Sequence, residues 1–258
     1  MGTLSRYFDK HYDAAVTFAC CGMAMGIMVM PLLVQFLLDI YGWRGTLLLL
    51  SGISFNAVVC SLIYRPSRTD GDYQPLSSSP STTGSLEMSN CYTNIWKSLD
   101  MHLFTDVWFV TMALIMSGNG YSLTGWMIFI VPHGLDIGLS PYKASVVSTS
   151  GGIGYIIGVL FYPALCRVMS HKAQLYTSGL AMAVALSMDP VASDLFSSYI
   201  GMIACSIVYC FARAVNSASW FSTMNENIED DKMVNAVGWA FAGYGLASII
   251  SGFSTGEV

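Results

Sequence analysis

The polar stretch Arg65–Asp106, RPSRTDGDYQPLSSSPSTTGSLEMSNCYTNIWKSLDMHLFTD, divides the chain into two apolar parts of unequal size. It is rich in Ser, Thr, Pro, Gly and charged residues, so it cannot cross a bilayer or bury a core of its own, and we expect a flexible tether. Two long apolar spans precede the tether and five follow it, at about 14–38, 45–64, 107–132, 145–166, 174–189, 196–222 and 234–254.

Composition places the chain in a membrane. Of its 258 residues, 54% are hydrophobic and 10% are charged, whereas about a quarter of a soluble domain is charged. A membrane-spanning helix needs about 20 apolar residues, and the seven spans approach or reach this length, the fifth being the shortest. A transmembrane barrel would instead alternate apolar and polar residues. We therefore predict an all-α integral membrane protein that contacts the lipid bilayer.

No pattern of reactive residues indicates an enzyme. The seven cysteines form no CxxC or His-spaced array, so we interpret them as packing residues and expect no metal site. There is no nucleophile–base arrangement and no phosphate-binding loop in the sequence. We expect no cofactor and no nucleic-acid partner.

The basic residues indicate an orientation, because cytoplasmic loops are enriched in Lys and Arg. If the N-terminus is inside, only Arg44 and Lys143 fall in outer segments. The inner segments then hold eight basic residues, which are Arg6, Lys10, Arg65, Arg68, Lys97, Arg167, Lys172 and Lys232. The tether is therefore expected in the cytoplasm.

Glycines recur at helical spacing in several spans. Gly22 and Gly26 lie four residues apart in the first span, and Gly154 and Gly158 repeat this spacing in the fourth. Such pairs share one helix face and allow a neighbouring backbone to approach closely. We expect Gly154 and Gly158 to serve helix packing.

The beginning of the chain carries a family pattern. An aromatic pair and a lysine open the first span, small residues follow, and a YGWRG turn leads into the second span; the residues are Tyr7, Phe8, Lys10, Ala15, Ala19, Gly22, Gly26, Gly42, Trp43, Arg44 and Gly45. With this pattern the chain resembles the monocarboxylate transporter family of the major facilitator superfamily.

The resemblance implies a helical bundle in which this chain supplies helices five to eleven of twelve. Residues 1–64 would then end the N-terminal bundle, 65–105 would form the central loop, and 106–258 would make up most of the C-terminal bundle. The implied function is secondary transport of a small organic anion, such as a monocarboxylate, by alternating access. Proton symport, a plasma-membrane location and an ancillary membrane subunit are also implied, although the chain alone is expected to be incomplete.

One family feature is missing. Proton-coupled members carry Asp-x-x-x-Arg in their eighth helix, and the corresponding residues here are Gly154 and Gly158, or Tyr155 and Val159 in the other register. Neither pair contains an acid or a base. The family's link between proton and substrate therefore has no counterpart at these positions.

Three polar residues inside spans are candidates for the substrate pathway: Arg213, Asn119 and Asn56. Arg213 has two interpretations. It reaches the headgroups if the membrane ends near Asn216, which is the preferred interpretation, or it binds a carboxylate inside the membrane. For Asn119 and Asn56 we prefer interhelical hydrogen bonds over a role in the pathway.

Two other classes of membrane protein compete with a transporter. The first class is a truncated membrane protein that regulates a carrier but does not transport a solute itself. A seven-helix receptor is the other, suggested by the number of spans. A receptor has its N-terminus outside, and this orientation contradicts the distribution of basic residues.

Overall fold

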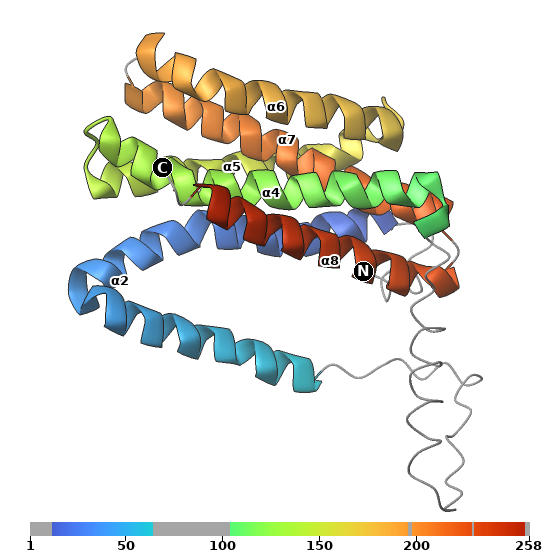
Figure 1. Ribbon diagram of the computed structural model, residues 1–258, viewed down its shortest axis with the longest axis horizontal. Helices are drawn as coiled ribbons and strands as arrows, with labels where there is room; N and C mark the ends of the chain where they lie inside the picture. Colours follow the sequence, from blue (N-terminus) through green and yellow to red (C-terminus); the bar gives the residue numbers. More distant parts are fainter. Residues whose placement is uncertain (1–11, 64–103, 196–197, 229, 256–258) are drawn as a thin grey trace, which may run out of the picture. The chain divides into compact units, whose positions relative to one another are not determined.

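The computed structural model describes residues 12–63, 104–195, 198–228 and 230–255, and every long element in this part of the chain is a helix (Figure 1). The all-α prediction is confirmed. Tyr7, Phe8, Lys10 and nearly all of the tether lie outside the described residues. The helices are α2 (Tyr12–Ile63), α4 (Val107–Asp136), α5 (Pro141–Leu165), α6 (His171–Leu195), α7 (Ser198–Asn227) and α8 (Asp230–Thr255).

Helix α2 contains both of the first two predicted spans. It is 52 residues long, and its one non-helical backbone position is Gly42, with φ 63° and ψ 179°. Residues with a Cβ adopt a positive φ at a cost, so glycine is suited to this position. The expected turn at YGWRG is therefore found at Gly42, where two helical segments meet within α2, and these two segments contain the first two predicted spans.

Five helical segments in the described residues are long and apolar enough to cross a membrane. They are Cys20–Val58 of α2, all of α4 and α5, Tyr199–Asn227 of α7 and Asn235–Ser254 of α8. Helix α6, which contains the fifth predicted span, is not among them. Its first half includes Gln174, Thr177 and Ser178, and its second half includes Asp189, which lower its hydropathy.

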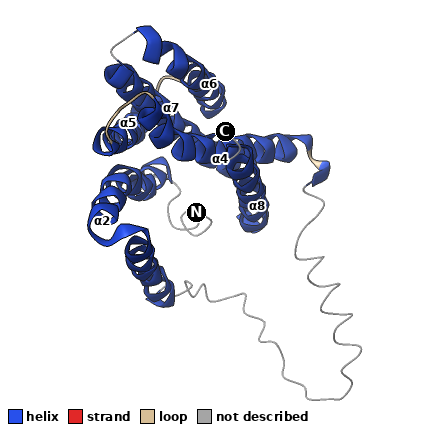
Figure 2. Cartoon of the chain, turned by 60° about the vertical axis from the view of Figure 1, so that its left-hand side comes forward, coloured by secondary structure: helices blue, strands red, loops and turns tan. Residues whose placement is uncertain are grey.

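Helix α7 organises the packing of the bundle. It lies against α5 along one side and α6 along another, while α4 packs mainly against α8 and also against α5. Figures 1 and 2 both show α6 beside α7. The core of this bundle includes the large, fully buried side chains of Trp220, Tyr155, Tyr162 and Tyr209.

The chain forms two compact units, and the boundary between them falls inside α2. One unit contains α2 up to Gln35 together with α4–α8, and the other contains Phe36 and the rest of α2. Within the first unit, a Cβ on Gly152 of α5 would lie 2.6 Å from the backbone of Met28. Gly22 and Gly26, in contrast, have open space around them, so the close approach expected at this pair is absent from the described structure.

The ends of α4 and α5 follow local capping rules. Asp106 caps α4, because its carboxylate accepts a hydrogen bond of 3.0 Å from the amide of Trp108. Ser140 caps α5 in the same way, with the amide of Lys143 as donor, and Pro141 occupies the first turn. Gly138, with φ 88°, makes the turn between these helices possible.

Candidate functional site

The most unusual segment of the bundle is the second half of α7, which is polar and buried. Every residue from Ala212 to Met224 is buried. This run contains Arg213, of which 4% is exposed. Five further polar residues of the run are buried as well, namely Asn216, Ser217, Ser219, Ser222 and Thr223.

Arg213 is a buried cation without a counterion among the residues that the structure describes. Its Nε and Nη1 are buried and have no hydrogen-bond partner, and no ion pair within the described ranges includes this residue. Helix α7 continues for fourteen residues beyond Arg213, or about 21 Å at 1.5 Å per residue. Packing encloses the side chain in the described structure, and the expectation that Arg213 reaches the headgroups stays a prediction.

Hydroxyl groups from two helices surround this part of α7. Tyr209 and Ser217 lie four residues before and after Arg213, so all three share one helix face. Tyr155 of α5 joins them, since its hydroxyl lies 3.0 Å from that of Ser217 and donates to the sulfur of Met23 in α2. The positive charge of Arg213 acts electrostatically on the hydroxyls of Tyr155 and Tyr209.

Helix α4 adds a polar and an aromatic side chain to this group. The Ser122 hydroxyl lies 3.2 Å from that of Tyr209. The ring of Trp126 packs against the ring of Tyr209 with 5.3 Å between centroids. Ser122 and Trp126 also line a pocket of about 410 Å³ between α4 and α6. We define the Arg213 site as Arg213, Tyr155, Tyr209, Ser217 and Ser122.

The glycines of α5 hold it close to α7. A Cβ on Gly154 would collide with the carbonyl oxygen of Ile207, and one on Gly158 would lie 2.6 Å from the carbonyl oxygen of Phe211. These positions therefore need glycine for packing. In the second alignment with the family's Asp-x-x-x-Arg motif, Tyr155 occupies the position of the acid. Tyr155 is a member of the Arg213 site.

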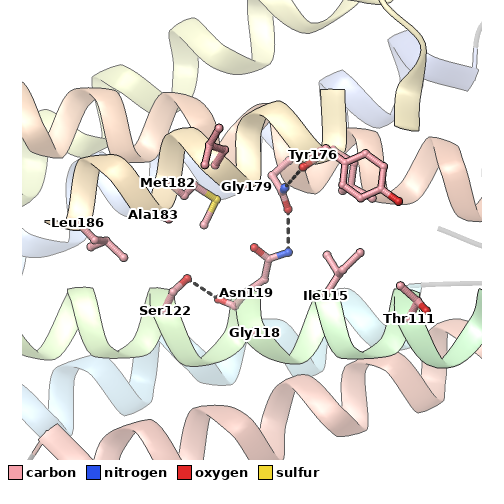
Figure 3. Close-up of a pocket in the computed structure, with 13 residues that line it drawn as sticks. Thr111, Ile115, Gly118, Asn119, Ser122, Tyr176, Gly179, Met182, Ala183 and Leu186 are labelled. Atoms are coloured by element: carbon pink, nitrogen blue, oxygen red, sulfur yellow. Dashed lines mark hydrogen bonds between the residues drawn. The ribbon is translucent and has the colours of Figure 1, made fainter. Parts of the chain in front are cut away.

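Asn119 lines a pocket shown in Figure 3, which Ser122 of the Arg213 site also lines. Nδ2 of Asn119 donates to Oδ1 of Asn216 at 2.8 Å, and Asn216 donates to Ser178 at 2.9 Å and to the carbonyl of Leu175 at 3.1 Å. These bonds join α4, α7 and α6, as the interhelical interpretation expects. The pocket has a volume of about 500 Å³ and a mostly apolar surface, and Asn216 lines it as well.

Asn56 does not form the expected interhelical bond in the described structure. It is exposed, and its Nδ2 donates to the carbonyls of Gly52 and Ile53 in its own helix. The Arg44 guanidinium lies 5.1 Å from the centre of the Trp43 ring, next to the kink. The side chains of Ala15 and Ala19 lie outside the described ones.

Sequence reasoning missed Tyr155, Tyr209 and Ser217 as members of the site. The spacing of Tyr209, Arg213 and Ser217 is a signal that the sequence contains, because it aligns three polar groups on one side of an apolar helix. Tyr155 lies on α5, so only the folded structure shows that it belongs to the site. In the part of the chain that the structure describes, no group of three His, Cys, Asp or Glu residues could hold a metal ion.

The comparison with protein families defines the class of this protein. Residues 1–252 match the Major Facilitator Superfamily. The chain therefore belongs to this superfamily of helical membrane proteins.

Its relatives within the superfamily confirm the resemblance seen at the first span. The chain is 30% identical to monocarboxylate transporter 11 of Mus musculus over 154 residues, which are 60% of this chain and 31% of the relative. It is 24% identical to monocarboxylate transporter 4 of Gallus gallus over 264 residues, covering 99% of this chain and 52% of the relative. Monocarboxylate transporter 13 of Bos taurus is 25% identical, with coverages of 97% and 52%. The chain spans about half the length of these full-coverage relatives.

Proposed function

We propose that this chain is part of a secondary transporter that moves a small organic anion across a membrane, and that Arg213 binds the carboxylate of that anion. One observation carries the proposal: a buried guanidinium lies in the middle of a helix that is long and apolar enough to cross a membrane, and two of its nitrogens have no hydrogen-bond partner among the described residues. Burying a charge without a counterion is costly, so such groups in membranes serve function by default.

The chemistry of the Arg213 site suits a monocarboxylate. A guanidinium is planar and pairs a carboxylate through two parallel hydrogen bonds, which would satisfy the free donors. The hydroxyls of Tyr155, Ser217, Tyr209 and Ser122 pair with one another in the unliganded chain. They are able to exchange these bonds for polar atoms of a small solute. The names of the relatives support a monocarboxylate as the transported class.

We propose the alternating-access mechanism of the family for the transport step. Residues 1–64 would belong to one helical bundle and 106–258 to a second, with 65–105 as the connecting loop, and the two bundles would rock about the site. The distribution of basic residues supports a cytoplasmic loop. A plasma-membrane location, an ancillary membrane subunit and coupling to protons are parts of the same proposal. Because Gly154, Gly158, Tyr155 and Val159 include no acid, coupling would require other groups.

Ligand-dependent thermal stabilisation of the purified chain tests the proposed site. L-lactate, pyruvate and larger monocarboxylates are added to the detergent-solubilised protein, and unfolding is followed by intrinsic fluorescence. A ligand at a hundred times its Kd stabilises the folded state by about 2.7 kcal/mol. We expect an increase in melting temperature with at least one monocarboxylate, and no increase with its uncharged amide.

Two substitutions and one control make this test specific. R213Q is expected to abolish the stabilisation, and R213K to weaken it, because a lysine provides a point charge without the planar fork. R167Q makes the same change at an exposed arginine in the α5–α6 connection and should leave the effect intact. Equal stabilisation of the wild type and R213Q would refute an anion site at Arg213.

A further inference from the structure

The pocket of about 410 Å³ between α4 and α6 has features that the proposed anion site does not use. It shares Ser122 with the Arg213 site, but most of its lining consists of aromatic and aliphatic side chains, namely Tyr121, Trp126, Phe129, Ile130 and Leu186. Its volume lies in the range of about 300–1,000 Å³ that is usual for small-molecule sites. Two ionisable residues, His133 and Asp189, complete the lining. We call this the Asp189 pocket.

Asp189 is the acid that lines this otherwise apolar surface. Its side chain is 23% exposed, and its ion-pair neighbour among the described residues is His133, whose Nε2 lies 3.8 Å from a carboxylate oxygen. This distance is too long for a hydrogen bond. The carboxylate makes no hydrogen bond within the part of the chain that the structure describes, so both of its oxygens can accept one. A carboxylate in apolar surroundings is costly, and a cation is the partner that lowers this cost.

The aromatic side chains of the pocket favour a cation as well. The face of an aromatic ring attracts an ammonium group. The ring of Phe129 stacks on that of His133 with 5.7 Å between centroids, which places this ring at the same end of the pocket as Asp189. Trp126 lies seven residues before His133 on α4, or about 10 Å along the helix. The pocket therefore has a charged end and an apolar end.

These two ends have different depths in the bundle. His133 lies three residues before the last residue of α4, Asp136, so the charged end is near the end of the helix. Trp126 is 8% exposed and lies closer to the middle of α4. An amphipathic molecule in a bilayer has the same order, with its charge near the headgroups and its apolar part toward the membrane centre.

We propose that the Asp189 pocket binds a lipophilic ammonium ion, which is a protonated amine on an apolar body. The ammonium group donates to the carboxylate of Asp189 beside the face of Phe129, and the apolar body lies along Trp126 and Leu186. A carboxylate ligand is disfavoured because Asp189 repels it, and an uncharged ligand leaves the charge of Asp189 without a partner. This inference does not rest on the proposed anion site.

Binding of 4-phenylbutylamine tests the proposal, because a chain of four carbons separates its ammonium group from its phenyl ring. The tritiated amine is equilibrated at pH 7 with phosphatidylcholine nanodiscs that hold the full chain, and the label bound to empty nanodiscs is subtracted. 4-Phenylbutanol has the same apolar body without the charge and is used as a competitor. We expect saturable binding of the amine and an affinity for the alcohol lower by about tenfold or more, since hydrogen bonds between charged groups are the stronger ones.

Substitutions at the charged end locate the bound amine. D189N keeps the shape of the side chain and removes its charge, so the affinity for the amine should fall by about tenfold or more, whereas competition by 4-phenylbutanol should change little. D136N makes the same change at an exposed carboxylate of α4 and should leave both affinities unchanged.

A variant of Phe129 provides a second test that does not depend on D189N. F129L keeps an apolar side chain without an aromatic face, and it should weaken binding of the amine several-fold. Phe129 is 43% exposed, so F129L is expected to fold. The proposal is overturned if the amine does not bind saturably, if the amine and the alcohol bind equally well, or if the wild type, D189N and F129L bind the amine with the same affinity.

Discussion

At the scale of single residues, Arg213 shows a conflict between stability and binding. A charge buried without a partner lowers the stability of the fold, and replacement of buried charges by apolar residues of similar volume is often neutral or stabilising. Ser217 and Tyr155 satisfy each other rather than the guanidinium. The proposed function explains why an arginine is tolerated here, since its partner is an anion that comes and goes.

Replacing Arg213 by methionine should therefore stabilise the unliganded protein. Methionine is long and flexible enough to fill the space of the arginine stem. We expect R213M to increase the free energy of unfolding by up to about 4 kcal/mol, measured by thermal unfolding in detergent without ligand, and to abolish the stabilisation by monocarboxylates. R167M, at an exposed position, is the control and should change little. A lower melting temperature for R213M would mean that Arg213 already has a stabilising partner in the fold.

At the scale of helices, the contact between α5 and α7 depends on residues without side chains. Gly154 and Gly158 lie one turn apart on α5 and face the carbonyls of Ile207 and Phe211. This approach brings Tyr155 of α5 beside the polar face of α7. The packing of these two helices therefore positions the Arg213 site.

A methyl group at this contact should separate the helices. G154A is expected to destabilise the fold by about 1–3 kcal/mol, because the new Cβ collides with backbone that cannot easily move. G238A is the matched control: this glycine of α8 has open space around it, so alanine should be neutral or stabilise by up to about 1 kcal/mol. The stabilities of both variants relative to the wild type are measured by thermal unfolding. Equal stabilities for G154A and G238A would contradict the close contact.

The sequence predicted the positions of the helices better than it predicted which helices pack against one another. The limits of α4 and α5 follow from apolar runs with Asp106 and Ser140 as caps, and these are local signals. The change of direction inside α2 was predictable as well, because the YGWRG turn contains Gly42, whose positive φ interrupts the helix. The burial of Arg213 was not predictable, because the polar residues after it resemble an interface, whereas α5 and α6 bury them. Such burial depends on which helices are neighbours, and the spacing within one helix does not contain that information.

At the scale of the whole chain, polar groups gather inside the first unit and apolar groups face outward. Leu160 of α5, Ile200 of α7 and Phe253 of α8 each expose more than 60% of their surface, while the polar second half of α7 is buried. This distribution suits a bundle in lipid with a polar interior. It is the arrangement expected if solutes contact the interior of the bundle.

Binding of labelled monocarboxylates is the most direct test of the central claim, which is that the buried arginine of α7 binds an organic anion. Nanodiscs with equal amounts of the wild-type chain, R213Q or R167Q are equilibrated with ¹⁴C-labelled L-lactate or pyruvate, and the bound label is compared with that of empty nanodiscs. The account predicts saturable binding above the empty nanodiscs for the wild type and R167Q, and an affinity at least tenfold lower for R213Q, since a buried charge-assisted bidentate pair contributes about 1.5–3 kcal/mol or more. Wild-type binding no greater than that of empty nanodiscs, or unchanged binding by R213Q, would contradict it.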